Sequence, residues 1–234
     1  MQDLTTGSIS RHLLKTTGFM LVMMVFQTLY FLVDLYWVGR LGTTSVAGVG
    51  IAGNASFIVL ALSQMLSVGT TTVISHAVGR RDRAEAEHLF NQALVLSSVV
   101  GVLFLIVGIA VHVPYSRAMS ADAETAALAA SYLRWFVPAL ALQFPMGTMA
   151  AALRAAGQFK PAMFVSTSSV VVNMLLAPIL IFGWGTGHAF GVAGAAISSL
   201  LSIVFALVWL VRYFRPADAY VRFASHDWRP QLTT

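Results

Sequence analysis

The residue of this chain that is best suited to chemistry is an aspartate inside its first long apolar run. From Gly18 to Val38 the sequence has 21 residues, and Asp34 is the only charged one. On a helix, Gln27, Tyr30 and Asp34 have offsets of 0, 3 and 7, so they share one face. An acid at the centre of a membrane helix costs about 2.5–3.5 kcal/mol on insertion scales and usually has a function. This polar face therefore predicts a hydrated cavity, whereas an aspartate that only reaches interfacial water is the alternative.

Polar residues also recur inside later apolar runs. Ser166, Ser169 and Asn173 again have offsets of 0, 3 and 7, which places them on one helix face. Serines in such helices often bond only to their own backbone. An amide is costlier to bury without a partner, so Asn173 is a candidate cavity residue. Ser199 and Gln64 bring further polar groups to the sixth and second runs.

Several kinds of chemistry are not supported by these residues. Only one acid lies within a predicted span, so a two-carboxylate catalytic pair is missing. No pair of histidines has ligand spacing with a nearby acid, which argues against a metal site. The chain has no cysteine and no glycine-rich phosphate loop with a lysine. We therefore predict that the protein is not an enzyme and has no bound cofactor or metal.

The composition indicates which solvent surrounds the elements that position these residues. Charged residues make up 10% of the chain, against about 25% in soluble domains, and hydrophobic residues make up 58%. The apolar runs are too long and uniform for alternating barrel strands, so helices must satisfy the backbone in the hydrocarbon. We predict an all-α integral membrane protein. Its six transmembrane helices occupy residues 18–38, 49–76, 90–112, 126–153, 162–182 and 190–214.

The charges between the runs predict the orientation in the membrane. With six spans both termini lie on one side, and eleven Lys and Arg residues fall there against three on the other side. The three are Arg40, Arg117 and Arg134. The positive-inside rule then places both termini in the cytoplasm, in a bacterial-type inner membrane. Because the basic residues cluster between apolar runs, we expect lipid phosphates as their partners and no nucleic acid, despite a pI near 10.0.

Some local signals make specific structural predictions. Asp82 and Glu85 have the spacing of a helix-capping box. Residues 113–125 are expected to form a long outer loop, and Pro138 and Pro145 are expected to bend the fourth span. The stretches "SVAGVGIAG" and "GVAGAAISS" open the second and sixth spans, which suggests that spans one and two form a hairpin like that of spans five and six.

Several ordered motifs together resemble one known family. They are "LYFLVDLYWVGRLG", "SVAGVG", "ISHAVGRRDRAEAEHLFNQAL", "ALRAAGQFKPAM" and "NMLLAPILIFGWGTG" followed by "GVAGAAISS". This set is similar to the multidrug and toxic compound extrusion (MATE) transporters, which usually have twelve spans in two six-span lobes. The resemblance covers nearly all of the chain and matches only the N-terminal lobe. Residues 1–214 are then the lobe, and residues 215–234 a cytoplasmic inter-lobe linker that is cut short.

The resemblance implies efflux of organic, often cationic, compounds in exchange for H⁺ or Na⁺. It assigns cation coupling to Asp34, Tyr30 and Asn173. We predict a substrate cavity lined by Gln27, Gln64, Ser169 and Ser199. Two departures weaken the transfer of the mechanism, because Ala177 stands where many members have a second acid and the first span lacks a proline.

The length of the chain leaves three explanations open, since a carrier of this kind needs two bodies around a central site. The chain is a fragment of a longer product, which we favour, or it pairs with a second copy or a partner lobe, or it is inactive. Two other functions are alternatives. A lipid-linked precursor flippase would need a strongly basic cavity, and a membrane scaffold would be indifferent to neutralising Asp34.

Overall fold

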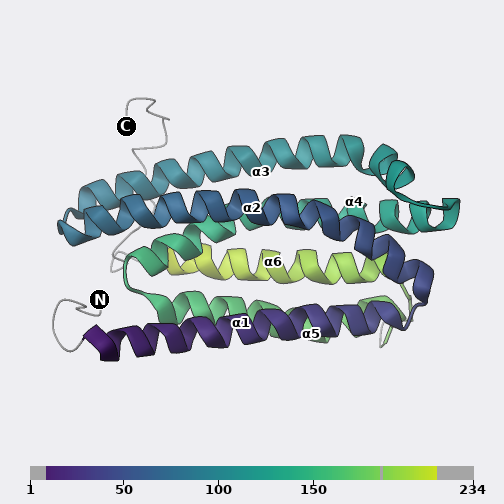
Figure 1. Cartoon of the computed structure of the whole chain (residues 1–234), viewed down its shortest axis with the longest axis horizontal. Helices are drawn as coiled ribbons and strands as arrows, with labels where there is room; N and C mark the ends of the chain where they lie inside the picture. Colours follow the sequence, from purple (N-terminus) through teal and green to yellow (C-terminus); the bar gives the residue numbers. More distant parts are fainter. Residues whose placement is uncertain (1–8, 185–186, 215–234) are drawn as a thin grey trace.

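The computed structural model describes residues 9–184 and 187–214, which form six helices (Figure 1). The helices are α1 (Ile9–Gly39), α2 (Thr43–Gly79), α3 (Arg83–Met119), α4 (Ala123–Ala155), α5 (Phe159–Phe182) and α6 (Val192–Phe214). In the described residues, α2 to α6 are long and apolar enough to cross a membrane, and α1 adds a shorter apolar segment, Met24–Gly39. The predicted all-α fold with six helices is confirmed. The predicted linker, residues 215–234, lies outside the described residues.

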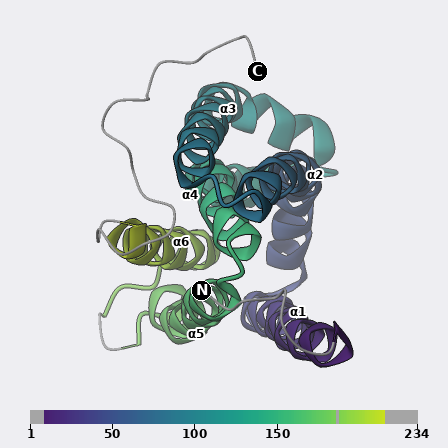
Figure 2. The same ribbon diagram turned by 90° about the vertical axis from the view of Figure 1, so that its left-hand side faces the viewer.

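Helix α4 occupies the centre of the lobe. In the end-on view of Figure 2 it lies between the α2–α3 pair and α6, and it packs against all three. In the most apolar segment of α4, 56% of the residues are buried. In that of α3 the share is 17%, because α3 faces outward. Helix α1 packs mainly on α5, on the far side of the lobe. Helix α1 is thus held to the bundle mainly by α5, although its neighbour in the chain is α2.

Two large apolar clusters lie at the two ends of the bundle, and a smaller one around Val59, Leu140 and Phe144 joins α2 and α4 between them. At one end Phe90 of α3 stacks on Phe214 of α6, with ring centroids 4.8 Å apart. At the other end the buried Val38, Tyr132 and Ile181 belong to one cluster, which joins α1, α4 and α5. The polar positions of α5 and α6 lie between the two end clusters along each helix, so polar groups meet where the middle of α5 contacts α6.

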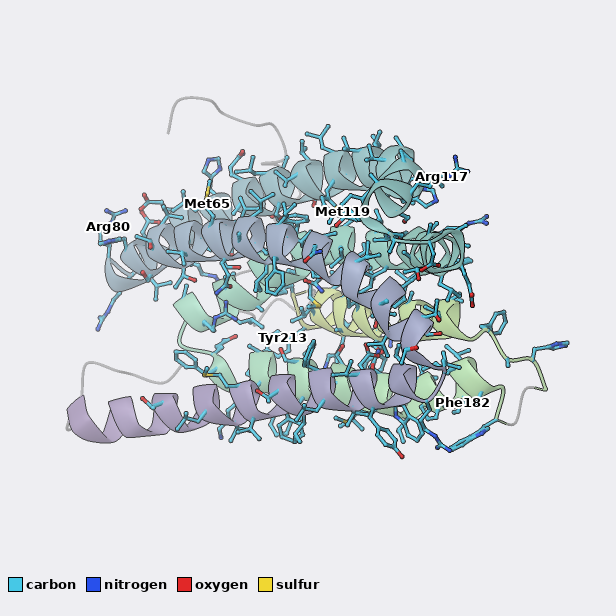
Figure 3. The ribbon with its side chains drawn as sticks, turned by 45° about the vertical axis from the view of Figure 1, so that its right-hand side comes forward. Met65, Arg80, Arg117, Met119, Phe182 and Tyr213 are labelled. Atoms are coloured by element: carbon cyan, nitrogen blue, oxygen red, sulfur yellow. The ribbon has the colours of Figure 1, made fainter. Side chains whose placement is uncertain are left out.

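The turn between α2 and α3 has half of the predicted capping box. The Asp82 carboxylate accepts a hydrogen bond from the Glu85 backbone N–H at 3.0 Å, as an N-cap residue does. The Glu85 carboxylate does not return the bond, because it pairs with Arg80 at 2.5 Å and the Asp82 N–H donates to the Ala77 carbonyl. Figure 3 shows Arg80 and Arg117 at opposite ends of the bundle.

The expected outer loop over residues 113–125 is helical at both of its ends. Helix α3 continues through Pro114 to Met119, and α4 begins at Ala123, so only residues 120–122 connect them. The Ser120 hydroxyl donates to the Ser116 carbonyl at 2.7 Å, which satisfies one of the acceptors left free in the last turn of α3. Asp122 accepts from both the N–H and the hydroxyl of Thr125 and starts α4. These bonds also hold the pKa of the Asp122 carboxyl below its usual value.

Helix α4 runs as one helix through both of its prolines. Pro145 has no N–H, so the Ala141 carbonyl lacks its usual partner four residues on. That carbonyl lies against Gly101 of α3, where an added Cβ would be only 2.7 Å from the oxygen. Because Gly101 has no Cβ, α3 can approach α4 closely at this carbonyl.

The stretches "SVAGVGIAG" of α2 and "GVAGAAISS" at the start of α6 contact different helices. A Cβ on Gly48 would lie 3.2 Å from Leu128 and Ala129 of α4, whereas one on Gly194 would lie 2.5 Å from the Leu180 carbonyl of α5. Helices α5 and α6 pack along each other, but α1 and α2 hardly touch. The suggestion that both hairpins are built alike is therefore wrong. What the stretches share is a glycine that permits close helix approach.

Candidate functional site

A cavity of about 350 Å³ lies among α1, α2, α4, α5 and α6. Its apolar walls include Phe26, Met146, Val170 and Ile203. Polar side chains reach it from four helices, and the described ones are Ser63, Gln64, Ser67, Gln143, Arg154, Ser166, Thr167, Ser169, Asn173, Ser199 and Ser202. A cavity of this size with mixed walls suits a small organic molecule.

The wall formed by α5 and α6 is held by an interhelical hydrogen-bond network. The Asn173 amide donates to the hydroxyl oxygens of Ser198 at 3.3 Å and Ser199 at 3.2 Å, and its side chain is almost fully buried. One turn earlier the Ser169 hydroxyl donates to the Ser202 carbonyl at 3.0 Å. Small serines on α6 let α5 come close enough for these bonds. The polar stripe of α5 thus faces both its neighbour and the cavity.

We predict that Asn173→Ala lowers the stability of the protein by about 1 kcal/mol, the usual size of such a bond between membrane helices. The loss is modest because Ser198 and Ser199 also donate to the Ala195 carbonyl. Thermal unfolding in detergent measures the change. Asn54→Ala, at an exposed site on α2, is the matched control and should leave the midpoint unchanged. Equal midpoints for the two variants would contradict the role of this network.

The polar cavity residues that the sequence analysis did not predict include two on α4. Gln143 and Arg154 belong to α4, and with Gly147 and Ala150 they have offsets of 0, 4, 7 and 11, which is one helix face. The predicted fourth span ends at Leu153, which places Arg154 among the basic residues of the following cytoplasmic loop. Its half-buried side chain instead lines the cavity. The helical spacing from Gln143 was the signal that could have identified it.

Asp34 has an unusual environment on α1. Its Oδ1 atom is buried and has no hydrogen-bond partner among the described residues, and the same holds for Nε1 of Trp37 one turn later. Asp34 is not among the described residues of the cavity wall. The side chains of Gln27 and Tyr30 lie outside the described part of the chain. The structure therefore brings Gln64, Ser169, Asn173 and Ser199 to one cavity, while the coupling role of Asp34 and Tyr30 stays a prediction.

Ala177 lies away from this polar wall. It is 1% exposed and packs in the apolar cluster with Val38 and Ile181. The resemblance to the MATE transporters implies a second carboxylate at this position. The alanine that is present instead is small and apolar, which suits the apolar cluster around it. Within the described residues, no group of three or more His, Asp and Glu side chains could hold a metal ion.

Apolar helices long enough to cross a membrane, with a polar-walled cavity among them, define a multi-pass membrane protein with an internal binding cavity. The MatE family model matches residues 20–179. The chain belongs to the MatE family, and it is a multi-pass membrane protein.

Individual relatives agree with this family. The chain is 26% identical over 169 residues to a probable multidrug resistance protein NorM of Oceanobacillus iheyensis, which covers 72% of this chain and 38% of the relative. It is 25% identical over 178 residues to a FAD transporter of Shewanella oneidensis, covering 75% and 39% of the two chains. A solved MATE structure in complex with MaL6 matches with a TM-score of 0.89 and 30% identity, over 97% of this chain and 50% of that one. The chain thus spans less than half the length of these curated relatives and half of the solved one.

Proposed function

We propose that this protein takes part in secondary active efflux of organic compounds, as one lobe of a two-lobed transporter. The observation that carries the proposal is the cavity of about 350 Å³ with polar groups from α2, α4, α5 and α6 inside a MatE lobe. One similar relative is named for multidrug resistance and another for FAD transport. The family therefore includes more than one kind of organic cargo, and the predicted cationic substrate remains part of the proposal.

The second half of the transport unit is proposed to be another six-helix lobe. It is either a C-terminal lobe or a second copy of this chain, because alternating access needs two bodies around a central site. Large apolar side chains are exposed on the outer surfaces of α1 to α3, which suits contact with lipid or with such a lobe. The proposed location is a bacterial-type inner membrane with both termini in the cytoplasm.

The driving force is proposed to be inward flow of H⁺ or Na⁺, with Asp34 as the exchanging group. A charged carboxylate attracts a cationic compound, and a protonated or Na⁺-bound one does not. Cation and compound would then compete for α1, which is the minimum requirement for exchange. The unpartnered Oδ1 atom supports this role, because a buried carboxylate oxygen without a partner is ready to accept a proton or bind a cation.

The experiment is cation-driven uptake of ethidium into inside-out vesicles from cells that produce this protein. We expect uptake that requires an imposed gradient and stops when nigericin abolishes the pH gradient or, for Na⁺ coupling, when Na⁺ is omitted. Vesicles without the protein are the control. Gradient-independent uptake, or the same uptake in both kinds of vesicle over a panel of organic compounds of both charges and FAD, would overturn the proposed function.

A further inference from the structure

The charge of the cavity wall is positive. Arg154, in the last turn of α4, is the only charged residue among the described residues that line it. Its side chain is half-buried, and no hydrogen bond or ion pair to another residue satisfies its guanidinium in the described structure. A partly buried guanidinium without a partner from the protein keeps donors that suit an anionic group.

Two hydroxyl groups on the same wall also lack partners. The Oγ atom of Ser63 on α2 and the Oγ1 atom of Thr167 on α5 are buried, and neither has a hydrogen-bond partner among the described residues. Most buried hydroxyls in membrane helices bond back to their own backbone, as Thr71 does here to the Ser67 carbonyl at 2.8 Å. Ser63 and Thr167 therefore keep unused donors at this wall, which a rotation of either side chain would bring to a ligand in the cavity.

The rest of the cavity indicates what such a ligand carries besides its charge. Phe26, Val165, Val170 and Leu210 contribute apolar surface from α1, α5 and α6. We propose that this cavity binds an amphiphilic organic anion, whose carboxylate, phosphate or sulfonate group pairs with the Arg154 guanidinium. Arginine suits this role because its planar donors match two oxygens of one anionic group.

This inference deepens the proposed function and rests on it for the idea that the cavity receives cargo. Asp34 of α1 does not line this cavity, so its negative charge does not oppose an acidic group at Arg154, and a compound that carries both charges is compatible with both proposals. The same anionic group also occurs on lipid headgroups. The shared chemistry is therefore an acidic group on an apolar body, and the source is decided by experiment.

The test uses the full chain in phosphatidylcholine nanodiscs and two dyes. One dye is 1-anilinonaphthalene-8-sulfonate, and the other is N-phenyl-1-naphthylamine, which has the same rings without the sulfonate. Arg154→Gln should weaken binding of the sulfonate dye about ten-fold or more, as expected for a charged hydrogen-bonded pair. Binding of the uncharged dye should not change. Empty nanodiscs provide the background.

Matched variants keep the test decisive. Arg154→Lys, which keeps the charge, should restore most of the affinity for the sulfonate dye. Lys160→Gln removes an exposed charge that does not line the cavity, so it should behave like the wild type. Thr167→Val, which keeps the shape, should weaken the sulfonate dye about three-fold and serves if Arg154→Gln fails to fold. Equal affinity of wild type and Arg154→Gln for the sulfonate dye, or an equal loss for both dyes, would overturn the proposal.

A second set of nanodiscs contains phosphatidylglycerol and separates the two sources. If phosphatidylglycerol weakens binding of the sulfonate dye to the wild type but not to Arg154→Gln, the occupant is a lipid headgroup. If phosphatidylglycerol leaves binding to the wild type unchanged, the occupant is a soluble anion. Binding is measured without transport, so the two proposals fail separately. Charge-selective binding without vesicle uptake would overturn the proposed function alone, and uptake with charge-blind binding would overturn this inference alone.

Discussion

Asp34→Asn is expected to reduce gradient-driven export to the level of membranes that lack the protein. Asparagine has nearly the same shape but cannot release a proton or hold a negative charge at neutral pH. Since Asp34 is the only acid in the apolar segment of α1, no neighbouring carboxylate on that helix can replace it. Ala177 likewise offers no acid at the position where the resemblance to the MATE transporters implies a second one. Uptake of ethidium into inside-out vesicles measures the effect.

Asp122→Asn is the matched control for this prediction. Asp122 is an exposed N-cap residue of α4, and asparagine caps helices about as well as aspartate. We therefore expect wild-type export from this variant. Thermal unfolding should show that Asp34→Asn is folded, because removing an unpartnered buried charge does not remove a described hydrogen bond. Full export by Asp34→Asn would refute the coupling role of this residue.

Gly194→Ala is expected to destabilise the protein by about 3 kcal/mol, at the upper end of the usual cost of overpacking. The added Cβ would lie 2.5 Å from the Leu180 carbonyl oxygen and 2.6 Å from its carbon. These are backbone atoms of α5, so no side-chain rotation relieves the clash and the two helices must separate. The shift would also strain the bonds from Asn173 to α6. Thermal unfolding in detergent measures the loss.

Gly53→Ala provides the comparison within α2. Nothing lies within 4 Å of a Cβ added at Gly53, and alanine is favoured over glycine inside a helix by about 0.5–1 kcal/mol. This variant should unfold at the same temperature as the wild type or slightly higher. If Gly194→Ala were as stable as Gly53→Ala, the close approach of α5 and α6 would not be a requirement of the fold.

The apolar runs and the spacing of polar residues were sufficient to predict much of this lobe. Long uniform runs leave the helix as the only solution in lipid, so the number of helices followed from the sequence. The stripe of Ser169 and Asn173 could be predicted because offsets of 3 and 4 repeat on a helix face. The capping role of Asp82 also followed, because an N-cap depends only on residues within one turn.

Other features depend on which helices are neighbours, and local spacing does not contain that information. The sequence predicted neither that α1 packs on α5 rather than on α2 nor that α4 lies at the centre. The sequence also predicted a loop position for Arg154. A charged residue next to a turn is expected to face water, and only the tertiary structure shows that other helices surround it. The sequence by itself thus determined the helices and the polar faces that they present. Only the tertiary structure decided which faces meet around the cavity, because the close approach of helices at Gly48, Gly101 and Gly194 is set by contacts between residues far apart in the chain.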